Sequence, residues 1–385
     1  MVGHRKTTAT GGSLLLTARY GDGYKRAQMP AASSSSGAGR AAERHQKPSG
    51  PAAGIPAAEL FVGAGGLALG LEAAGFETVL AVEIDRDACD TISALMPKID
   101  LRQASVEAID FRRYRRKLCL LSGGPPCQPY SIGGKQEGRD DERDFMPEFI
   151  RAVEEAEPAA FLLENVPGLA LGDNASYFKR LIARFAGLGY SVTWRIINAA
   201  DYGVPQKRRR LFVVGLRNGE FRFPEPTHGD EATRPHVPAG SVLRADAVIG
   251  DANKSIVVYA KNPDPRPSPY DGHLFNGGGR PIDLTKPSPT ILAAAGGNKT
   301  HFIDTCGLVP EYHRHLMAGG APKTGTLPGG RRLTVQESAL VQTFPEGMRF
   351  AGSRSSQYTQ IGNAVPPKLA AILASAVARA LRSRE

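Results

Sequence analysis

From residue 58 to residue 217 the chain alternates short apolar runs with amphipathic stretches, and this pattern constrains the fold more than any other feature. Short apolar runs between helical segments are typical of βαβ units, which assemble into a parallel sheet. The pattern predicts an α/β fold with a doubly wound, mostly parallel, Rossmann-like sheet, whose ligands bind beyond the carboxyl ends of the strands. We predict strands at 59–62, 78–83, 118–122, 159–164, 191–198 and 211–216, and helices at 66–74, 87–96, 144–157 and 177–188.

This regularity is lost after Arg217. Residues 218–330 are dense in Pro and Gly, with only short apolar runs such as 255–260. A structureless insertion of that length would be unusual, so we expect a second, smaller and irregular domain there. Helical periodicity resumes at 333–342 and again at 366–381, which predicts that the segment 331–385 returns to the first domain, residues 56–217.

The amino-terminal 55 residues have a different composition. Residues 27–53 consist mainly of Ala, Ser, Gly and Pro, which bury too little surface to offset the entropy of ordering, so we predict disorder. Residues 1–56 hold eight basic and two acidic residues, a net of +6 within the formal +10 of the chain. The remaining positive charge is compatible with a nucleic-acid partner but does not require one.

Cysteine usage and hydropathy limit the setting of the protein. The four cysteines show neither metal-ligand spacing nor the density of a disulfide-stapled secreted domain. There is also no uninterrupted apolar run of about 18 residues, the length that spans a membrane. We therefore expect a cytoplasmic protein with no metal and no membrane partner.

A glycine cluster follows the first predicted strand, in the sequence ELFVGAGGLALGLEAAGF. Gly63, Gly65 and Gly66 allow a tight turn and close approach of a ligand to the backbone. The second strand ends in VEID, where Glu83 is placed to accept hydrogen bonds from two ribose hydroxyls. The turn alone would suit NAD, FAD, S-adenosylmethionine or a purely structural role. It is not G-x-G-x-x-G, however, which favours a cofactor without phosphates.

Three further segments place reactive side chains at strand ends. LLSGGPPCQPYS delivers Cys127 to the carboxyl edge of the sheet, and FLLENVPGL ends the next strand with Glu164. In YGVPQKRRRLFVVG, strand alternation puts Arg208 and Arg210 on one side and Arg209 on the other. One guanidinium could hold O2 of a pyrimidine and the other could pair with a phosphate or with Glu164. Taken singly, each has a structural explanation: an inert thiol, a salt-bridged Glu and a solvated basic run.

Together these segments resemble the bacterial DNA (cytosine-5) methyltransferase family. The matching blocks stand in the family's order from about Glu59 to the end of the chain; they are FVGAGG, VEID, GPPCQPYS, ENVPGL, QKRRRLF, RRLTVQESALVQTFPEG and QIGNAVPPKL. The resemblance implies S-adenosylmethionine as cofactor and double-stranded DNA as substrate. Residues 56–217 would then be the catalytic and cofactor-binding domain, and residues 218–330 the target-recognition domain.

The resemblance also assigns roles to individual residues. It implies Cys127 as the nucleophile, Glu164 as its assistant at N3 of cytosine, and Arg208 and Arg210 as active-site arginines. Ser105 stands where members usually carry an Asp that bonds the adenine amino group, which is a departure from the family. The cofactor would be contacted by Phe61, Gly63, Ala64, Gly66, Glu83, Ile84, Ser105, Val106, Gly124, Pro126, Phe145 and Asn363, and DNA by Gln128, Ser131, Thr290, Asn298 and Lys299.

The reaction implied by the resemblance begins with rotation of the target nucleotide out of the duplex, because C6 of a stacked cytosine is inaccessible. Residues 131–144 have the composition of a mobile lid. We expect a monomer that serves a restriction-modification system alongside a cognate endonuclease. The alternatives are a transfer-RNA cytosine-5 methyltransferase, an idle DNA-binding regulator and a small-molecule methyltransferase; the large variable domain, the retention of Cys127 and Glu164, and the seven matching blocks argue against them in turn.

Overall fold

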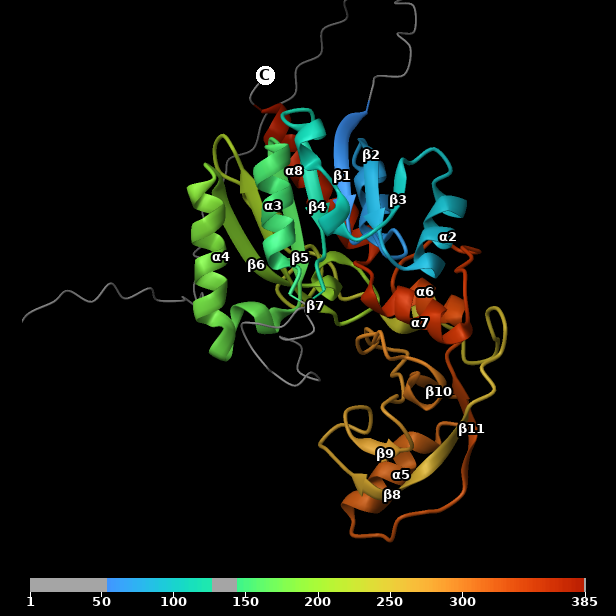
Figure 1. Cartoon of the computed structure of the whole chain (residues 1–385). Helices are drawn as coiled ribbons and strands as arrows, with labels where there is room; N and C mark the ends of the chain where they lie inside the picture. Colours follow the sequence, from blue (N-terminus) through green and yellow to red (C-terminus); the bar gives the residue numbers. More distant parts are fainter. Residues whose placement is uncertain (1–53, 127–143, 384–385) are drawn as a thin grey trace, which may run out of the picture. The chain divides into compact units, whose positions relative to one another are not determined.

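The computed structural model describes residues 54–126 and 144–383. Its larger sheet has seven strands in the order β3-β2-β1-β4-β5-β7-β6 (Figure 1). The first five strands in this order run parallel, and β7 is antiparallel to both of its neighbours. The predicted mostly parallel α/β fold is confirmed. The strands are β1 Ile55–Leu60, β2 Phe76–Glu83, β3 Leu101–Gln103, β4 Leu120–Gly123, β5 Ala160–Asn165, β6 Ser191–Asn198 and β7 Arg209–Leu216.

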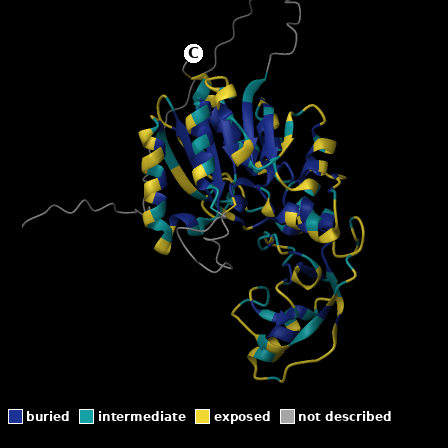
Figure 2. Cartoon of the chain, in the orientation of Figure 1, coloured by how far each residue is buried: buried dark blue, intermediate teal, exposed yellow. Residues whose placement is uncertain are grey.

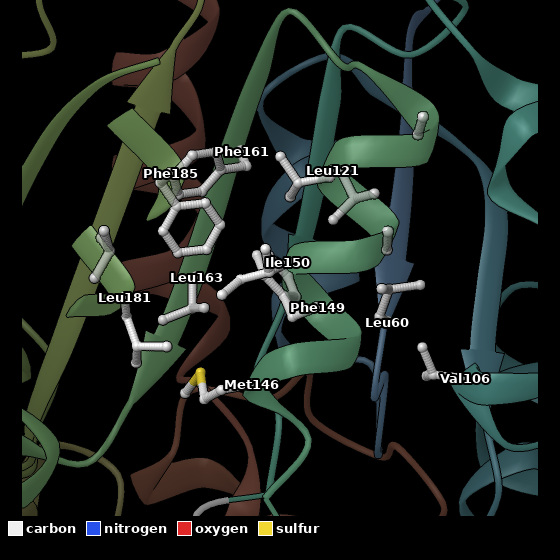
Figure 3. Packing of buried hydrophobic residues seen from close by; sticks show 14 of the residues in the cluster. Leu60, Val106, Leu121, Met146, Phe149, Ile150, Phe161, Leu163, Leu181 and Phe185 are labelled. Carbon is white, nitrogen blue, oxygen red and sulfur yellow. The ribbon is translucent and has the colours of Figure 1, made fainter. Parts of the chain in front are cut away.

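Helices cover both faces of this sheet, and its central strands β1, β4, β5 and β7 are largely buried (Figure 2). On one face Phe149 and Ile150 of α3 and Leu181 and Phe185 of α4 pack against the strands, and the ring of Phe185 stacks on Phe161 of β5 with centroids 4.3 Å apart (Figure 3). On the other face α1 packs against α8. The helices around the larger sheet are α1 Gly66–Ala73, α2 Arg86–Leu95, α3 Met146–Ala156, α4 Ala175–Gly187 and α8 Pro367–Arg382.

The predicted and observed strand ends differ where side chains or turns intervene. β1 begins at Ile55 instead of residue 59 because residues 55–57 already pair with β2. It ends at Leu60 because Phe61 adopts a φ of 58°, which takes the chain out of the sheet. α3 begins at Met146, whose backbone N–H donates to the Asp144 carboxylate at 3.0 Å. β6 has the bounds that the sequence predicts.

A smaller antiparallel sheet lies within the Pro- and Gly-rich stretch, in the order β10-β11-β8-β9. Its core contains Val257, Phe275, Phe302 and Tyr312. The predicted domain boundary at residue 330 falls inside β11, which pairs with both β8 and β10. The elements are β8 Ile256–Asp264, β9 His273–Phe275, β10 Phe302–Asp304, α5 Leu308–Met317 and β11 Thr326–Arg332.

After β11 the chain forms α6 Val335–Val341, α7 Arg354–Asn363 and then α8. Among the described residues, 354–382 is the one helical stretch long and apolar enough, by length and composition, to cross a membrane. The structure breaks it into α7 and α8, and Leu369 and Leu373 of α8 are buried against the larger sheet. Short 3-10 helices in the described chain occupy Val106–Ala108, Phe111–Tyr114, Pro167–Ala170, Gly172–Asn174, Ala199–Tyr202, Ala239–Ser241 and Gly297–Lys299.

Candidate active site

The strand order of the larger sheet reverses between β1 and β4. The chain builds β2 and β3 on one side of β1, and β4 and β5 on the other. A crevice forms beyond the carboxyl ends of the strands at such a switch point. The two strand ends are close together, because a Cβ on Gly123 would lie 2.6 Å from the carbonyl oxygen of Leu60. The residues that follow β1 and β4 therefore enter the same region.

The glycine turn after β1, residues 61–66, favours glycine for two different reasons, backbone conformation and close packing. Gly65 has a φ of 77°, in the left-handed region that side chains disfavour. Gly66 opens α1, and a Cβ there would lie 2.3 Å from the carbonyl oxygen of Val365. The turn thus packs directly on the segment between α7 and α8, some 300 residues away in the sequence.

Glu83, at the end of β2, is held by the backbone of this turn. One carboxylate oxygen accepts from the N–H of Gly63 at 2.8 Å, and the other accepts from the N–H groups of Ile84 and Asp85, also at 2.8 Å. A carboxylate has about four acceptor positions, so about one is left for an outside donor. The side chain of Ile84 beside it is 67% exposed. A fixed carboxylate next to an open apolar side chain fits the ribose and adenine of S-adenosylmethionine.

The other predicted cofactor contacts come from five segments: those after β1, β3 and β4, the residue before α3, and the end of α7. Ser105 is half-buried and its hydroxyl donates to the Glu107 carboxylate at 2.9 Å. Val106 is buried in the core, and the ring of Phe61 meets that of Phe145 edge-on at 5.8 Å. Of the remaining predicted contacts, Ala64 is buried, Gly124 is half-buried, and Pro126 and Asn363 are exposed.

The loop after β4 lies against the end of β5. A Cβ on Gly124 would be 2.9 Å from a carboxylate oxygen of Glu164, so only glycine leaves this carboxyl room. The side-chain amide of Asn165 donates to the carbonyl oxygen of Pro125 at 3.1 Å. Asn165 therefore fixes the backbone two residues before Cys127. Cys127 itself, Gln128 and Ser131, together with most of the predicted lid at 131–144, lie outside the described residues.

Glu164 and Arg210 form an ion pair at the end of β5, with Nε of Arg210 3.1 Å from Oε1 of Glu164. Both side chains are largely buried. Burial raises the pKa of the Glu164 carboxyl, and the charges of Arg210 and Arg208 partly oppose this. The group can therefore carry a proton at a higher pH than an ordinary glutamate. The ion pair between Glu164 and Arg210 is one of the two pairings, with a phosphate or with Glu164, that the sequence predicted for these arginines.

Arg208 is fully buried and has different partners. Its guanidinium donates to the carbonyl oxygens of Ile291 at 3.1 Å and Gly362 at 2.7 Å. Burial lowers the pKa of Arg208 well below its ordinary value, and the nearby charge of Arg210 adds to this. Arg209 is exposed, so the predicted alternation is present. Arg208 thus ties the start of β7 to the stretch before β10 and to the end of α7.

Two buried glutamines that the sequence did not single out reinforce this tie. Nε2 of Gln206 donates to Oε1 of Gln342 at 2.9 Å, and Oε1 of Gln206 accepts from the N–H of Ile291 at 3.0 Å. Nε2 of Gln342 in turn donates to the carbonyl oxygen of Ile361 at 2.7 Å. Gln206 stands in the same block as the arginines, and this position is the one signal that could have identified it.

Three of the predicted DNA contacts, Thr290, Asn298 and Lys299, belong to the described residues. The hydroxyl of Thr290 donates to the carbonyl oxygen of Lys207 at 2.6 Å, so it is already used inside the protein. Asn298 and Lys299 are exposed, within the 3-10 helix Gly297–Lys299. Their roles toward DNA stay a prediction.

The fold, together with the glycine turn and the Glu164–Arg210 ion pair at the carboxyl edge of the larger sheet, defines a methyltransferase of the Rossmann-like class. The family model for C-5 cytosine-specific DNA methylases matches residues 55–262 and 290–379. The chain belongs to this family. Its members transfer the methyl group of S-adenosylmethionine, which is the cofactor of this chain as well.

Named relatives agree with this assignment. The chain is 34% identical to Type II methyltransferase M.NgoMIV of Neisseria gonorrhoeae, over 84% of this chain and 97% of the relative. It is 35% identical to Type II methyltransferase M.PspPI of Psychrobacter, over 84% and 79%. Its fold is similar to the crystal structure of a DNMT2 mutant from Spodoptera frugiperda, with a TM-score of 0.63, 17% identity, and coverage of 84% and 99%.

Proposed function

We propose that the protein methylates C5 of cytosine within a short double-stranded DNA sequence, as the modification enzyme of a type II restriction-modification system. One observation carries the proposal: the buried Glu164 carboxyl lies against Gly124, in the loop that leads to Cys127, and is paired with Arg210. The names of the relatives, which match 84% of the chain, support DNA as the substrate.

The chemistry follows from the poor reactivity of C5 in cytosine. C5 becomes nucleophilic only when a group adds to C6, and a soft thiolate such as that of Cys127 is suited to this addition. The reaction gains from a proton or hydrogen bond at N3, because it draws electron density out of the ring. Glu164 is assigned this task, since burial raises its pKa and so favours the protonated carboxyl.

Arg210 has capacity left for the substrate. Its Nε contacts Glu164 and its Nη1 donates to the carbonyl oxygen of Arg209 at 2.8 Å. Nη2 has no hydrogen bond to any residue in the described ranges, and we assign it to O2 of the flipped cytosine. Arg208 is assigned to positioning, because both of its terminal nitrogens already bond to carbonyl oxygens.

S-adenosylmethionine, when bound, supplies the methyl group to C5 from its sulfonium. The glycine turn would admit it close to the backbone, Glu83 would accept a ribose hydroxyl, and Ile84 would cover the adenine ring. Loss of the C5 proton to water, return of the N3 proton to Glu164 and cleavage of the C6–S bond, with Cys127 leaving as a thiolate, then restore the aromatic ring. We further propose that the protein acts as a monomer in the cytoplasm, alongside a cognate endonuclease.

The proposal is tested by incubating the full chain with labelled S-adenosylmethionine and either genomic DNA or, in a parallel reaction, transfer RNA, and then mapping 5-methylcytosine in the DNA by bisulfite sequencing. We expect one short, recurrent sequence to be modified. Label that enters transfer RNA instead of DNA would overturn the proposed substrate and favour the RNA alternative.

The nucleophile is tested separately with an oligonucleotide that carries 5-fluorocytosine at the mapped position. Fluorine cannot leave as a proton does, so the adduct persists, and we expect a covalent complex at Cys127 in the presence of the cofactor. Cys127→Ala should abolish both the complex and turnover while cofactor affinity stays near that of the wild type. A complex that still forms in Cys127→Ala would refute the assignment.

A further inference from the structure

A cavity of about 360 Å³ lies between three segments that are distant in the sequence. Its walls are residues 253–255 just before β8, the pair Gly296–Gly297, and the first residues of α7. The last of these contribute Arg354, Ser355 and Tyr358. Neither the Glu164–Arg210 ion pair nor the glycine turn lines this cavity.

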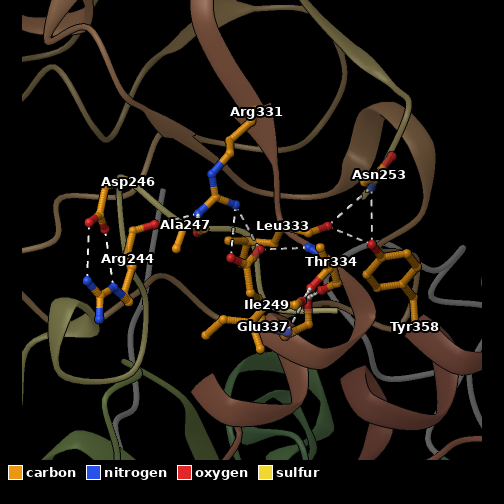
Figure 4. Close-up of polar contacts among 11 residues, drawn as sticks. Arg244, Asp246, Ala247, Ile249, Asn253, Arg331, Leu333, Thr334, Glu337 and Tyr358 are labelled. Atoms are coloured by element: carbon orange, nitrogen blue, oxygen red, sulfur yellow. Dashed lines mark hydrogen bonds and ion pairs between the residues drawn. The ribbon is translucent and has the colours of Figure 1, made fainter. Parts of the chain in front are cut away.

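Hydrogen bonds fix the back of this cavity (Figure 4). The side-chain amide of Asn253 donates to the hydroxyl of Tyr358 at 3.1 Å and to the carbonyl oxygen of Leu333 at 3.3 Å, while the Tyr358 hydroxyl donates to the same carbonyl at 2.6 Å. Oδ1 of Asn253 accepts from the N–H of Ser255 at 3.0 Å. The backbone on either side of Lys254 is therefore held in place, and so is the first half of α7.

The charge in this cavity is of one sign. Lys254 and Arg354 both line it and both are exposed. Within residues 54–126 and 144–383 neither of them forms an ion pair, and no carboxylate lines the cavity. Arginines close by are paired, as Arg331 is with Glu337 at 2.9 Å (Figure 4). Two unpaired cations around one cavity repel each other and attract an anion.

Gly296 and Gly297 form the third wall of the cavity, and neither carries a side chain that would fill it. Gly297 has a φ of 52°, which favours glycine. A Cβ on Gly296 would lie 3.8 Å from the hydroxyl of Ser355, and one on Gly297 would lie 3.6 Å from that of Ser255. Side chains there would enter the space between these hydroxyls. In the described part of the chain the N–H groups of both glycines donate no hydrogen bond, so two backbone donors and two hydroxyls remain for a ligand.

We propose that this cavity binds one backbone phosphate of the DNA substrate, with Lys254 and Arg354 as its charge partners and Ser255 and Ser355 as hydrogen-bond donors. The inference rests on the proposed function, because it takes DNA as the substrate. Phosphate contacts of this kind set the register of a protein on a duplex without reading its sequence. Asn298 and Lys299, which follow the glycine pair, would then stand next to the bound strand.

The position of the phosphate relative to the target base can be estimated from α7. This helix has ten residues, so roughly 15 Å separate its ends. One end lines the cavity and the other, at Gly362, bonds to Arg208. At an axial rise of about 3.4 Å per base pair, the length of α7 corresponds to about four base pairs, which sets the range over which the phosphate is searched for below.

The test is the salt dependence of DNA binding by the full chain, measured by fluorescence anisotropy on a duplex that carries the mapped sequence. For Lys254→Ala/Arg354→Ala we expect the slope of log Kd against log salt to fall by about one, the value for one lost phosphate contact. KM for DNA should rise at least about tenfold, with kcat at saturating DNA unchanged. Lys254→Arg/Arg354→Lys should retain the wild-type slope.

The matched control is Lys179→Ala/Arg184→Ala, which removes two exposed cations from α4. We expect it to leave the slope and KM unchanged. If the wild type binds and methylates DNA but the cavity variant keeps the wild-type slope, the phosphate site is wrong and the proposed function stands. If the wild type neither binds nor methylates DNA, both are wrong.

A second measurement locates the phosphate. Uncharged methylphosphonate linkages are placed one at a time within five base pairs of the target cytosine. We expect the wild type to lose affinity at one linkage that leaves the cavity variant unaffected, because that variant no longer makes the contact. Equal losses in both proteins at every linkage would contradict the inference.

Discussion

The carboxyl edge of the larger sheet and the cavity at the start of α7 both hold cationic side chains, but in opposite states. At the edge, Arg210 is paired with Glu164, and Arg208 is buried with two carbonyl partners. At the cavity, Lys254 and Arg354 are exposed, and no carboxylate from the described part of the chain lines it. A paired, buried charge is held in a fixed geometry, which suits a catalytic group. Exposed charges without an ion-pair partner in the described chain are available to a ligand that binds and dissociates.

A second cavity shows that basic lining alone does not make an anion site. It also measures about 360 Å³ and is lined by Arg116, Lys117 and Arg217. Here, however, the carboxylate of Glu157 pairs with Arg116 at 2.8 Å and lies 3.6 Å from Arg217, and it contacts Arg115 as well. The two cavities differ in the presence of a carboxylate, and this is the feature that distinguishes them.

The largest expected effect is at the carboxyl edge. Glu164→Gln keeps a hydrogen-bond donor for N3 but removes the proton transfer, so kcat should fall by about 10² to 10⁴. Because the pKa of Glu164 is raised, wild-type kcat should decline as pH rises through that pKa, and the variant should lack this limb. The measurement is single-turnover methylation across pH.

The exposed Glu154 of α3 offers the control, since Glu154→Gln changes the same atoms outside the site. We expect its rates to match the wild type. If Glu164→Gln retained the full wild-type kcat, proton donation by Glu164 to N3 of cytosine would be refuted.

An intermediate effect is expected at Arg208, which joins the edge to α7. Arg208→Lys cannot reach both the Ile291 and Gly362 carbonyl oxygens, so the free energy of unfolding should fall by about 3 kcal/mol. Arg209→Lys, one residue away and exposed, should change it by less than about 0.5 kcal/mol. Urea denaturation of both variants measures this. Equal unfolding free energies for the two variants would show that the hydrogen bonds of Arg208 to Ile291 and Gly362 do not stabilise the protein.

The smallest effect is expected at Glu59, a buried carboxyl on β1 that forms no ion pair within residues 54–126 and 144–383, whereas Glu164 pairs with Arg210. Burial raises its pKa well above the ordinary value, and the negative charge of Glu83 adds to this. Stability from the protonated form is therefore complete at low pH and is lost as pH rises through the folded-state pKa.

Glu59→Gln should match the wild type in unfolding free energy near pH 4 and exceed it at pH 8, by an amount that grows with pH. Chemical denaturation at both values measures this. A constant difference between the two proteins would mean that Glu59 is not buried as a titrating acid.

The larger sheet was predictable because its strands are continuous apolar runs separated by amphipathic helices. β3 was missed because it has three residues, two of them exposed. α7 was missed because its sequence, RSSQYTQIGN, has little helical periodicity, although Tyr358, Gln360 and Ile361 are buried. The smaller sheet rests on short antiparallel pairings with irregular register, which leave no clear period in the sequence.

The site shows the same division. The blocks ENVPGL and QKRRRLF led to two possible partners for one of the arginines, a phosphate or Glu164, and in the structure Arg210 pairs with Glu164. Nothing in the local sequence indicated that Arg208 bonds to carbonyl oxygens from two remote segments. The cavity residues could not be grouped either, because segments at 253–255, 296–297 and 354–358 meet only in the folded chain.

The contact between Gly66 and Val365 means that the smaller sheet is an excursion inserted between parts that touch each other. For such an excursion each doubling of length costs only about 0.6 kcal/mol in closure entropy. The family model passes over residues 263–289, the part of this excursion that includes β9, and matches most of the rest of the smaller sheet. A change in the length of this excursion would therefore leave the contact between the glycine turn and the segment between α7 and α8 in place.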